Sequence, residues 1–207
     1  TRQLLHLHAE SLRIGVRQRV YLSVCRADYM LHQATPSDEP RLLQVEMNMI
    51  SAGFTNLGPK TSAMHRYLTE RHSWPQPFVL PPNDASRITC EAMFEAFQLY
   101  GAPSAVIVMV VQPAEKNAFD QRVFDHYLAR EHGVIMRRYT LKQIADLAQV
   151  DNASGVMCIN GEEVALAYFR AGYTPRDYPS DDEWRARLML ETSRAIKSSD
   201  SDEIASI

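Results

Sequence analysis

The feature that most constrains the fold is the alternation of apolar and mixed segments in the second half of the chain. The longest uninterrupted apolar run, residues 105–111, has the length of a buried strand and is far too short to span a membrane. After it, the pattern predicts a helix over 119–131, a strand over 134–139 and a short helix over 141–147. Such alternation is typical of an α/β layer with an at least partly parallel sheet.

Two local signals extend this layer. Asn160-Gly161 is the favoured two-residue turn of a hairpin, so we predict a hairpin over 157–164 whose second strand reaches Phe169. The Ser-x-x-Glu capping box at 180–183 predicts the start of a helix that runs to about Lys197.

The first hundred residues carry a less regular pattern. A loop over 51–59, with two glycines and a proline, separates two predicted strands from two later helices, and Gly101 stops the second of these. The predicted elements are helices over 1–15, 61–72 and 84–100, and strands over 20–24 and 42–48.

Composition excludes several classes of protein. A formal net charge of -3, with basic residues spread along the chain, does not resemble a nucleic-acid-binding surface. Cys25, Cys90 and Cys158 form no C-x-x-C pair, so we expect neither a zinc site nor a disulfide framework. We therefore expect the protein to reside in a reducing compartment, the cytosol. The chain begins at Thr1 rather than Met, without a charged-then-apolar leader, so we expect a cut within a longer protein. The short apolar run leads us to expect no membrane partner.

A candidate metal site ends the second predicted strand. Because side chains two apart in a strand point to the same face, the carboxylate of Glu46 and the amide oxygen of Asn48 converge. Hard cations such as Mg²⁺ prefer oxygen ligands. The alternative is a solvated strand end, since a Glu-x-Asn pair often arises by chance.

Two stretches near this pair carry groups suited to a small anionic ligand. Arg26 offers a planar fork of donors for a carboxylate, although a salt bridge to Asp28 is the alternative. In the loop 50–53, small residues let backbone amides approach a ligand and Ser51 adds a hydroxyl. An ordinary turn is the alternative there.

Two more stretches follow apolar strands, at the edge where open α/β sheets bind ligands. Glu115, Asn117 and Gln121 suit the ends of an amino-acid-like ligand, with a polar helix start as the alternative. Arg170-Ala171-Gly172-Tyr173 places an arginine and a tyrosine around a glycine, with a surface arginine as the alternative. No Walker-type loop, G-x-S-x-G elbow or zinc spacing of histidines occurs, so no catalytic nucleophile is assigned.

Taken in order, these stretches resemble the eukaryotic glutathione synthetases. The family motif Arg-Ser-Asp-Tyr-Met is seen at 26–30 as Arg-Ala-Asp-Tyr-Met. The motif Gln-Ile-Glu-x-Asn-x-Ile-Ser-x-Ser-Phe is seen at 44–54 as Gln-Val-Glu-Met-Asn-Met-Ile-Ser-Ala-Gly-Phe. Glu-x-Asn-x-Phe-Asp-Gln-Arg is matched at 115–122, Tyr-Phe-Arg-x-Gly-Tyr-x-Pro at 168–175 and Trp-x-Ala-Arg-Leu-x-Leu-Glu at 184–191. The likeness extends over nearly the whole chain.

The resemblance implies an ATP-grasp ligase that joins glycine to γ-glutamylcysteine through an acyl phosphate and cleaves ATP to ADP and phosphate. It implies one or two Mg²⁺ ions held by Glu46 and Asn48, with Glu46 also beside the nucleotide, and a homodimer. The residues it implies for the γ-glutamylcysteine site are Arg26, Ile50, Ser51, Ala52, Gly53, Glu115, Lys116, Asn117, Gln121, Arg170, Ala171, Gly172 and Tyr173.

The chain departs from the family pattern at Gly53, where a hydroxyl residue is usual, and at Ala27, where a serine is usual. We predict part of the ATP-grasp body over 1–101, an inserted Rossmann-like substrate-binding domain with a mostly parallel sheet over 102–197, and a disordered tail over 198–207. The nucleotide-binding lysines, the glycine-rich lid and a further metal carboxylate of the family lie downstream, so we expect this stretch alone to be inactive.

Two other functions stay open at this point. One is a non-catalytic module that binds γ-glutamylcysteine or mediates dimerisation. The other is a related ligase that uses β-alanine, serine or another amino acid in place of glycine.

Overall fold

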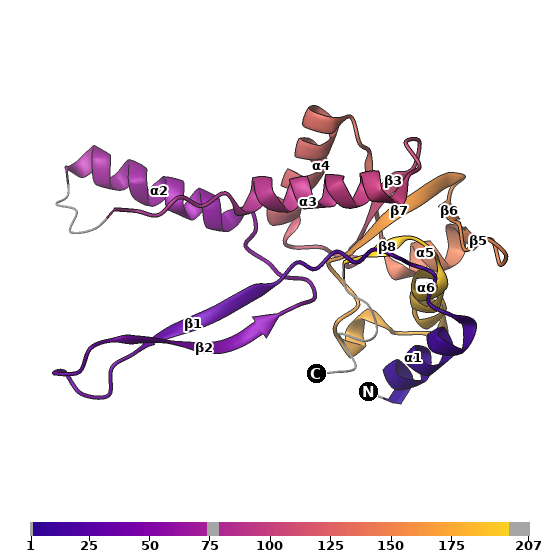
Figure 1. The fold of residues 1–207 in the computed structure, drawn as a ribbon, viewed down its shortest axis with the longest axis horizontal. Helices are drawn as coiled ribbons and strands as arrows, with labels where there is room; N and C mark the ends of the chain where they lie inside the picture. Colours follow the sequence, from indigo (N-terminus) through magenta and orange to yellow (C-terminus); the bar gives the residue numbers. More distant parts are fainter. Residues whose placement is uncertain (1, 74–78, 199–207) are drawn as a thin grey trace.

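A computed structural model describes residues 2–73 and 79–198 (Figure 1). The helices are α1 (Arg2–Ile14), α2 (Leu57–His72), α3 (Ala85–Tyr100), α4 (Ala118–His132), α5 (Leu141–Leu147) and α6 (Asp181–Thr192), with a 3-10 turn at Pro175–Asp177. The strands are β1 (Arg26–His32), β2 (Arg41–Asn48), β3 (Val106–Val110), β4 (Met136–Tyr139), β5 (Ala148–Val150), β6 (Met157–Ile159), β7 (Glu162–Phe169) and β8 (Ile196–Lys197).

The body of the molecule is a mixed six-stranded sheet with the order β4-β3-β7-β6-β5, in which β8 also pairs with β7. Strand β3 is parallel to β4 and β7, and β8 is parallel to β7, whereas β6 is antiparallel to both β5 and β7. The predicted α/β class is confirmed, with a mixed sheet.

Helices cover both faces of this sheet, which is why β3 is apolar and buried at every position. Ile107 and Met109 face a core cluster with side chains of α3 and α4, such as Met93 and Phe124. The alternate residues of β3 face a second cluster with side chains of α5 and α6, such as Ile144. No helix in the described parts of the chain combines the length and apolar character needed to cross a membrane.

Strands β1 and β2 form a separate antiparallel ribbon, which extends away from the body on the same side as α2 (Figure 1). Most of its side chains are exposed, and a bulge lies between Asp28 and Tyr29. A two-stranded ribbon is marginally stable on its own in water, so the contacts at its base decide where it lies.

Several local predictions are confirmed. Asn160 and Gly161 have φ values of 51° and 80°, as the central pair of a type I′ hairpin turn requires. Gly101 ends α3 in the left-handed conformation with φ 84°. The capping box at Ser180 and Glu183 opens α6 as predicted.

The strand predicted over 20–24 is wrong. Residues 20–24 form no regular strand, although Leu22 is buried. Within this segment a single backbone hydrogen bond is formed, in which Leu22 N donates to Lys197 O at 3.3 Å. The strand ladder begins instead at Arg26. The β-forming residues of the segment therefore reflect packing on the core rather than a hydrogen-bonded strand.

Two element boundaries and one strand also differ from the predictions. Helix α6 ends at Thr192 rather than near Lys197, because the chain becomes extended at Ser193 and then pairs with β7 as β8. Helix α2 starts at Leu57, and Pro59 is accommodated because its position in the first turn needs no N–H donor. Strand β5 was not predicted.

The predicted division at residue 101 stays a prediction. Helix α3, which precedes it, packs against α4 and contributes to the core beside the sheet. Ser198 accepts a hydrogen bond from Phe169 N at 2.9 Å, and residues 199–207 of the predicted tail lie outside the described part of the chain.

A buried ion pair lies between α6 and the sheet. The guanidinium of Arg187 is fully buried, donates from Nε to Glu191 Oε1 at 2.6 Å and stacks 4.2 Å from the centre of the Phe169 ring. Because the charged guanidinium of Arg187 is shielded from water, the folded state needs the carboxylate of Glu191 to offset the cost of burying that charge.

We expect Glu191→Gln to lower the free energy of unfolding by about 3–5 kcal/mol, because it leaves a buried cation without its counter-ion. Urea denaturation checks this. The matched control is Glu162→Gln, which removes the partner of Arg137 from a partly exposed pair and should cost less than about 1 kcal/mol. Equal costs for the two variants would contradict the importance of the buried pair.

Candidate functional site

The loop that follows the ribbon is held by one buried carboxylate, that of Asp120 in the first turn of α4. Asp120 Oδ1 accepts from the backbone N–H groups of Asn56 at 2.8 Å and Leu57 at 3.1 Å. Its Oδ2 accepts from Phe54 N at 3.0 Å. The carboxylate therefore anchors the loop and the start of α2 to α4. Sequence reasoning quoted Asp120 within a motif but gave it no role.

Arg170, at the end of β7, binds the same loop from the other side. Its side chain is buried, and Nη1 donates to Ala52 O at 2.7 Å, while Nη2 lies 3.5 Å from Asp120 Oδ2. Ser51 Oγ donates to Arg170 O at 3.0 Å. The hydroxyl of Ser51 therefore links the loop to the end of β7. Its predicted contact with a ligand stays a prediction.

Gly53 marks the point where three of the predicted stretches meet. A Cβ atom added at Gly53 would lie 3.8 Å from Arg170 Nη2 and 3.8 Å from Arg26 Nη1. It would lie 3.9 Å from Asn117 Nδ2. Residues from β1, the loop, the start of α4 and the end of β7 are therefore brought together around one position, although they are far apart in sequence.

The guanidinium of Arg26 has one part fixed and one part open. Nε and Nη2 donate to Asp28 at 2.7 and 2.9 Å. This hydrogen-bonded pair raises the pKa of Arg26 and lowers the pKa of Asp28. Nη1 has no hydrogen-bond partner among the described residues and faces Gly53. The salt bridge and an open donor thus coexist in one side chain.

Glu46 and Asn48 lie on one face of the ribbon. Asn48 pairs with Arg26 across the strands and Glu46 pairs with Asp28, so the four side chains are neighbours. Asn48 Nδ2 lies 3.1 Å from Glu46 Oε1 and 3.2 Å from Asp28 Oδ2. Rotation of the Asn48 amide would turn its oxygen toward this point. Two carboxylates and an amide oxygen fit a hard cation. Asp28, which lies opposite Glu46 in the strand register, adds a second carboxylate to this group that the sequence analysis did not assign, and both of its oxygens also accept from Arg26.

Other predicted residues serve the shape of the site. Glu115 Oε1 accepts from Asn117 N at 2.7 Å, which holds the turn before α4, while Lys116 is exposed. Gln121 is buried, and its carbonyl accepts from Arg138 Nη2 at 2.7 Å, so that oxygen is already engaged. Burial lowers the pKa of Arg138.

The segment after Arg170 is shaped by Asp177. Its Oδ2 accepts from the backbone N–H groups of Gly172 at 3.0 Å and Tyr173 at 3.1 Å. Tyr178 Oη donates to Gly172 O at 2.9 Å, and Gly172 has φ 92°, which favours glycine. The ring of Tyr173 is about half exposed (48%), while Ala171 and Ile50 pack on the core. Tyr173 is therefore available at the surface.

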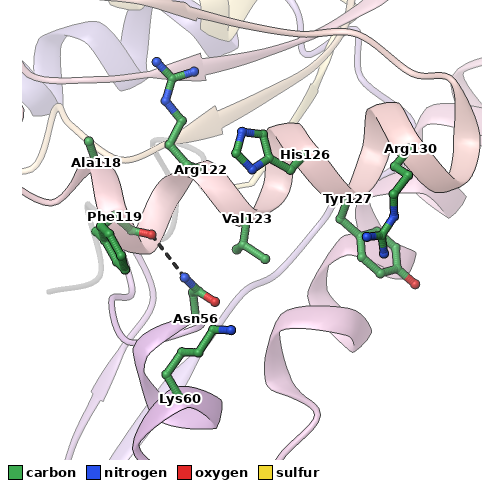
Figure 2. A pocket seen from close by; sticks show the side chains of 9 residues that line it. All are labelled: Asn56, Lys60, Ala118, Phe119, Arg122, Val123, His126, Tyr127 and Arg130. Carbon is green, nitrogen blue, oxygen red and sulfur yellow. Dashed lines mark hydrogen bonds between the residues drawn. The ribbon is translucent and has the colours of Figure 1, made fainter.

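A separate groove of about 550 Å³ lies between the start of α2 and the outer face of α4 (Figure 2). Figure 2 shows Asn56 donating to the carbonyl of Phe119, a bond of 3.1 Å, at one end of it. Lys60, Arg122 and Arg130 line the groove, and the two arginines pair with Asp125 and Glu131. None of the predicted site residues lines this groove, so it is distinct from the position around Gly53.

We expect Asp120→Ala to release the loop, because three backbone N–H groups lose their acceptor at once and Arg170 loses its nearest carboxylate. Hydrogen exchange at Phe54, Asn56 and Leu57 should accelerate by at least about 10-fold. The control is Asp125→Ala on the same helix. Among the described residues, the carboxylate of Asp125 forms an ion pair only with the partly exposed Arg122. Unchanged exchange at the three amides in Asp120→Ala would refute the anchoring role.

Comparison with known proteins shows where the chain belongs. The family described as eukaryotic glutathione synthase matches residues 105–202. The chloroplastic glutathione synthetase of Solanum lycopersicum is 39% identical over 200 residues, which cover 95% of this chain and 36% of the relative. The glutathione synthetases of Dictyostelium discoideum and Homo sapiens are each 35% identical, over 95% and 97% of this chain and 43% and 42% of their own lengths.

A solved structure agrees in fold. The glutathione synthetase-like effector of Globodera pallida in its apo form superposes with a TM-score of 0.79 at 21% sequence identity, covering 98% of this chain and 46% of that one. The chain thus spans less than half the length of these relatives. Similarity along nearly its whole length places the chain in the eukaryotic glutathione synthetase family.

Proposed function

We propose that this chain carries the γ-glutamylcysteine site of a glutathione synthetase. The observation that supports this most directly is the convergence of Arg26 Nη1, Arg170 Nη2 and Asn117 Nδ2 around Gly53. The dipeptide is an anion at neutral pH, and guanidinium and amide N–H groups are the donors that bind carboxylates. The site lies beside Glu46 and Asn48, the pair proposed to hold the cation.

The proposed reaction is the ATP-dependent ligation of glycine to γ-glutamylcysteine. The cysteinyl carboxylate attacks the γ-phosphoryl group of ATP, which releases ADP and leaves an acyl phosphate. The amine of glycine then displaces phosphate and forms the amide bond. Since the chain spans 36–43% of the length of its relatives, the complete reaction is proposed for a protein of their length.

The residues of this chain would act by binding and orientation. Arg26 and Arg170 hold the dipeptide in place, and their salt-bridge and carbonyl partners keep the guanidinium groups from turning away. Glu46 and Asn48, with Asp28 beside them, would hold Mg²⁺, which when bound neutralises charge on the phosphates. No covalent nucleophile from the protein is needed.

The remaining parts of the proposal rest on the family. They are an ATP-grasp body with an inserted Rossmann-like domain, divided near residue 101, and Glu46 beside the nucleotide. A homodimer and a cytosolic location belong to the same set. Glycine is the acceptor proposed, and a related ligase with another acceptor is the alternative. A module that binds γ-glutamylcysteine without ligation is the second alternative.

Titration calorimetry with γ-glutamylcysteine tests the site. We expect Arg26→Gln to weaken binding by at least about 10-fold, because a charge-assisted hydrogen bond to the carboxylate is lost. The matched control is Arg122→Gln, in the separate groove, which should bind within about 2-fold of the unchanged chain. Equal affinities for the two variants would refute the proposed site. Repeating the titration with MgATP separates the alternatives, since nucleotide-dependent binding favours a ligase and nucleotide-independent binding favours a module.

The proposed cation site is tested with Mn²⁺ as a probe for Mg²⁺. We expect Glu46→Gln to weaken Mn²⁺ binding, measured by electron paramagnetic resonance, by at least about 10-fold, because a neutral amide replaces an anionic ligand. Glu39→Gln in the turn of the same ribbon is the control and should leave the affinity unchanged. Loss of affinity in both variants, or in neither, would argue against a site at Glu46.

A further inference from the structure

A further groove, of about 350 Å³, lies at the end of the sheet opposite to Arg170. Two of its lining residues, Tyr100 and Arg194, contact Glu163 at the start of β7, whereas Arg170 follows the end of that strand. Glu163 and Arg170 are seven positions apart, which is about 23 Å along a strand at about 3.3 Å per residue. The groove is therefore separate from the site around Gly53.

Three arginines from distant parts of the chain line this groove. Arg17 and Arg19 lie in the segment after α1, and Arg194 lies between α6 and β8. Ser154, in the connection between β5 and β6, lies beside them. We call the groove lined by Arg17, Arg19 and Arg194 the arginine groove. Because these residues are far apart in sequence, only the folded chain brings their charges together.

Arg17 is held in place without a counter-ion of its own. A Cβ atom added at Gly155 would lie 2.6 Å from Arg17 Cδ, so the arginine side chain lies directly against the glycine backbone. Its Nη1 and Nη2 donate to the carbonyl oxygens of Asp151 at 3.3 Å and Asn152 at 2.6 Å. The carboxylate of Asp151 accepts instead from Ser154 Oγ and N, at 2.6 and 2.7 Å. These hydrogen bonds from Ser154 are the main cause of the lowered pKa of Asp151, and the charge of Arg17 adds a smaller effect.

Arg194 is also oriented by its neighbours. Its Nε donates to Tyr100 Oη at 2.9 Å, its Nη2 lies 3.3 Å from Glu163 Oε1, and its guanidinium lies 4.5 Å from the centre of the Tyr100 ring. Tyr100 donates to the same carboxylate oxygen at 2.7 Å. Burial raises the pKa of Tyr100 to about 12, so its hydroxyl keeps the proton for this bond at neutral pH.

The lining keeps donors that the protein does not use. In the part of the chain that the structure describes, Arg194 Nη1 makes no hydrogen bond, and Arg19 makes neither a hydrogen bond nor an ion pair. The three guanidinium groups outnumber the neighbouring carboxylates of Glu163 and Asp151. A concave surface with an excess of positive charge attracts anions. Donors that come from three arginines need at least three acceptor oxygens, which a phosphate group offers and a carboxylate does not.

We infer that the arginine groove binds a phosphate group. Arg17 and Arg194 are already oriented, so binding does not require them to be ordered first. The volume of the groove lies in the range of small-molecule sites, about 300–1,000 Å³. Val20, Leu99 and Ile196 supply apolar parts of the lining, so the phosphate group can belong to a small ester as well as to free phosphate. The inference does not depend on the proposed γ-glutamylcysteine site.

A titration with inorganic phosphate, followed by the amide chemical shifts of the chain in nuclear magnetic resonance, tests the site. Sodium chloride keeps the ionic strength constant, so general screening does not change during the titration. We expect saturable shifts at Ser154, Gly155 and Arg194, and none at Gly53 or Gly172. The absence of saturable shifts below about 10 mM phosphate, or equal shifts with chloride alone, would overturn the inference.

The matched variants are Arg19→Gln and Arg13→Gln. Each removes one exposed arginine, but Arg19 lines the arginine groove, whereas Arg13 lies on α1 and pairs with Glu10. We expect Arg19→Gln to bind phosphate at least about 5-fold more weakly, because a charge-assisted donor is lost, and Arg13→Gln to stay within about 2-fold of the unchanged chain. Equal affinities for the two variants would refute the site.

A second variant acts on the best-anchored arginine. Arg17→Gln should weaken phosphate binding by at least about 10-fold, because a held guanidinium is replaced by a neutral amide. If Arg17→Gln fails to fold, as judged by circular dichroism, Arg19→Gln decides, since Arg19 makes no hydrogen bond or ion pair within the described parts of the chain.

The two sources of a phosphate group are compared by repeating the titration with glycerol 3-phosphate. Tighter binding of the ester would identify a phosphate ester as the ligand, whereas equal or weaker binding would identify free phosphate. Both results support the inference, and binding of neither overturns it. Arg19→Gln should also leave the affinity for γ-glutamylcysteine within about 2-fold. A chain that binds phosphate but not γ-glutamylcysteine would therefore contradict the proposed function alone.

Discussion

The buried carboxylate of Asp120 is the contact on which the arrangement of the site depends. It accepts three backbone N–H groups from the loop after the ribbon and from the start of α2, and it lies beside Arg170. Backbone donors that leave water need an acceptor, and this one side chain supplies it for three of them. The direction in which the ribbon and α2 leave the body therefore depends on a residue of α4 (Figure 1).

The two arginines beside Gly53 are each held by a hydrogen-bond acceptor, yet each also has a nitrogen that lies near Gly53. Asp28 binds one side of Arg26, and the carbonyl of Ala52 binds one side of Arg170, while Arg26 Nη1 and Arg170 Nη2 both lie near Gly53. Partial compensation of this kind makes burial of a guanidinium tolerable and keeps donors free for an anion. The oxygen-bearing residues of the ribbon lie next to these arginines, so groups suited to an anion and to a cation are adjacent.

Much of the secondary structure could be predicted, because its signals are local. The apolar run of β3, the Asn160-Gly161 turn and the Ser180 capping box each act within a few residues, and all three formed as predicted. The segment over 20–24 was wrongly predicted as a strand because its valines and leucine alternate with polar residues. They do so because they pack on the core, and that alternation is also the pattern of a half-buried strand. The early end of α6 was missed because β8 is only two residues long and is defined by its pairing with β7.

The sequence by itself determined the α/β class, the residues at the ends of the strands and the family to which the chain belongs, since motifs and periodicity are properties of neighbouring residues. Only the tertiary structure decided that Arg26, Gly53, Asn117 and Arg170 meet, and that Asp28 joins Glu46 and Asn48. The bonds responsible join residues far apart in sequence, 64 positions for Asn56 to Asp120 and 119 for Ser51 to Arg170. Such contacts arise from packing of the whole chain, and no local pattern records them.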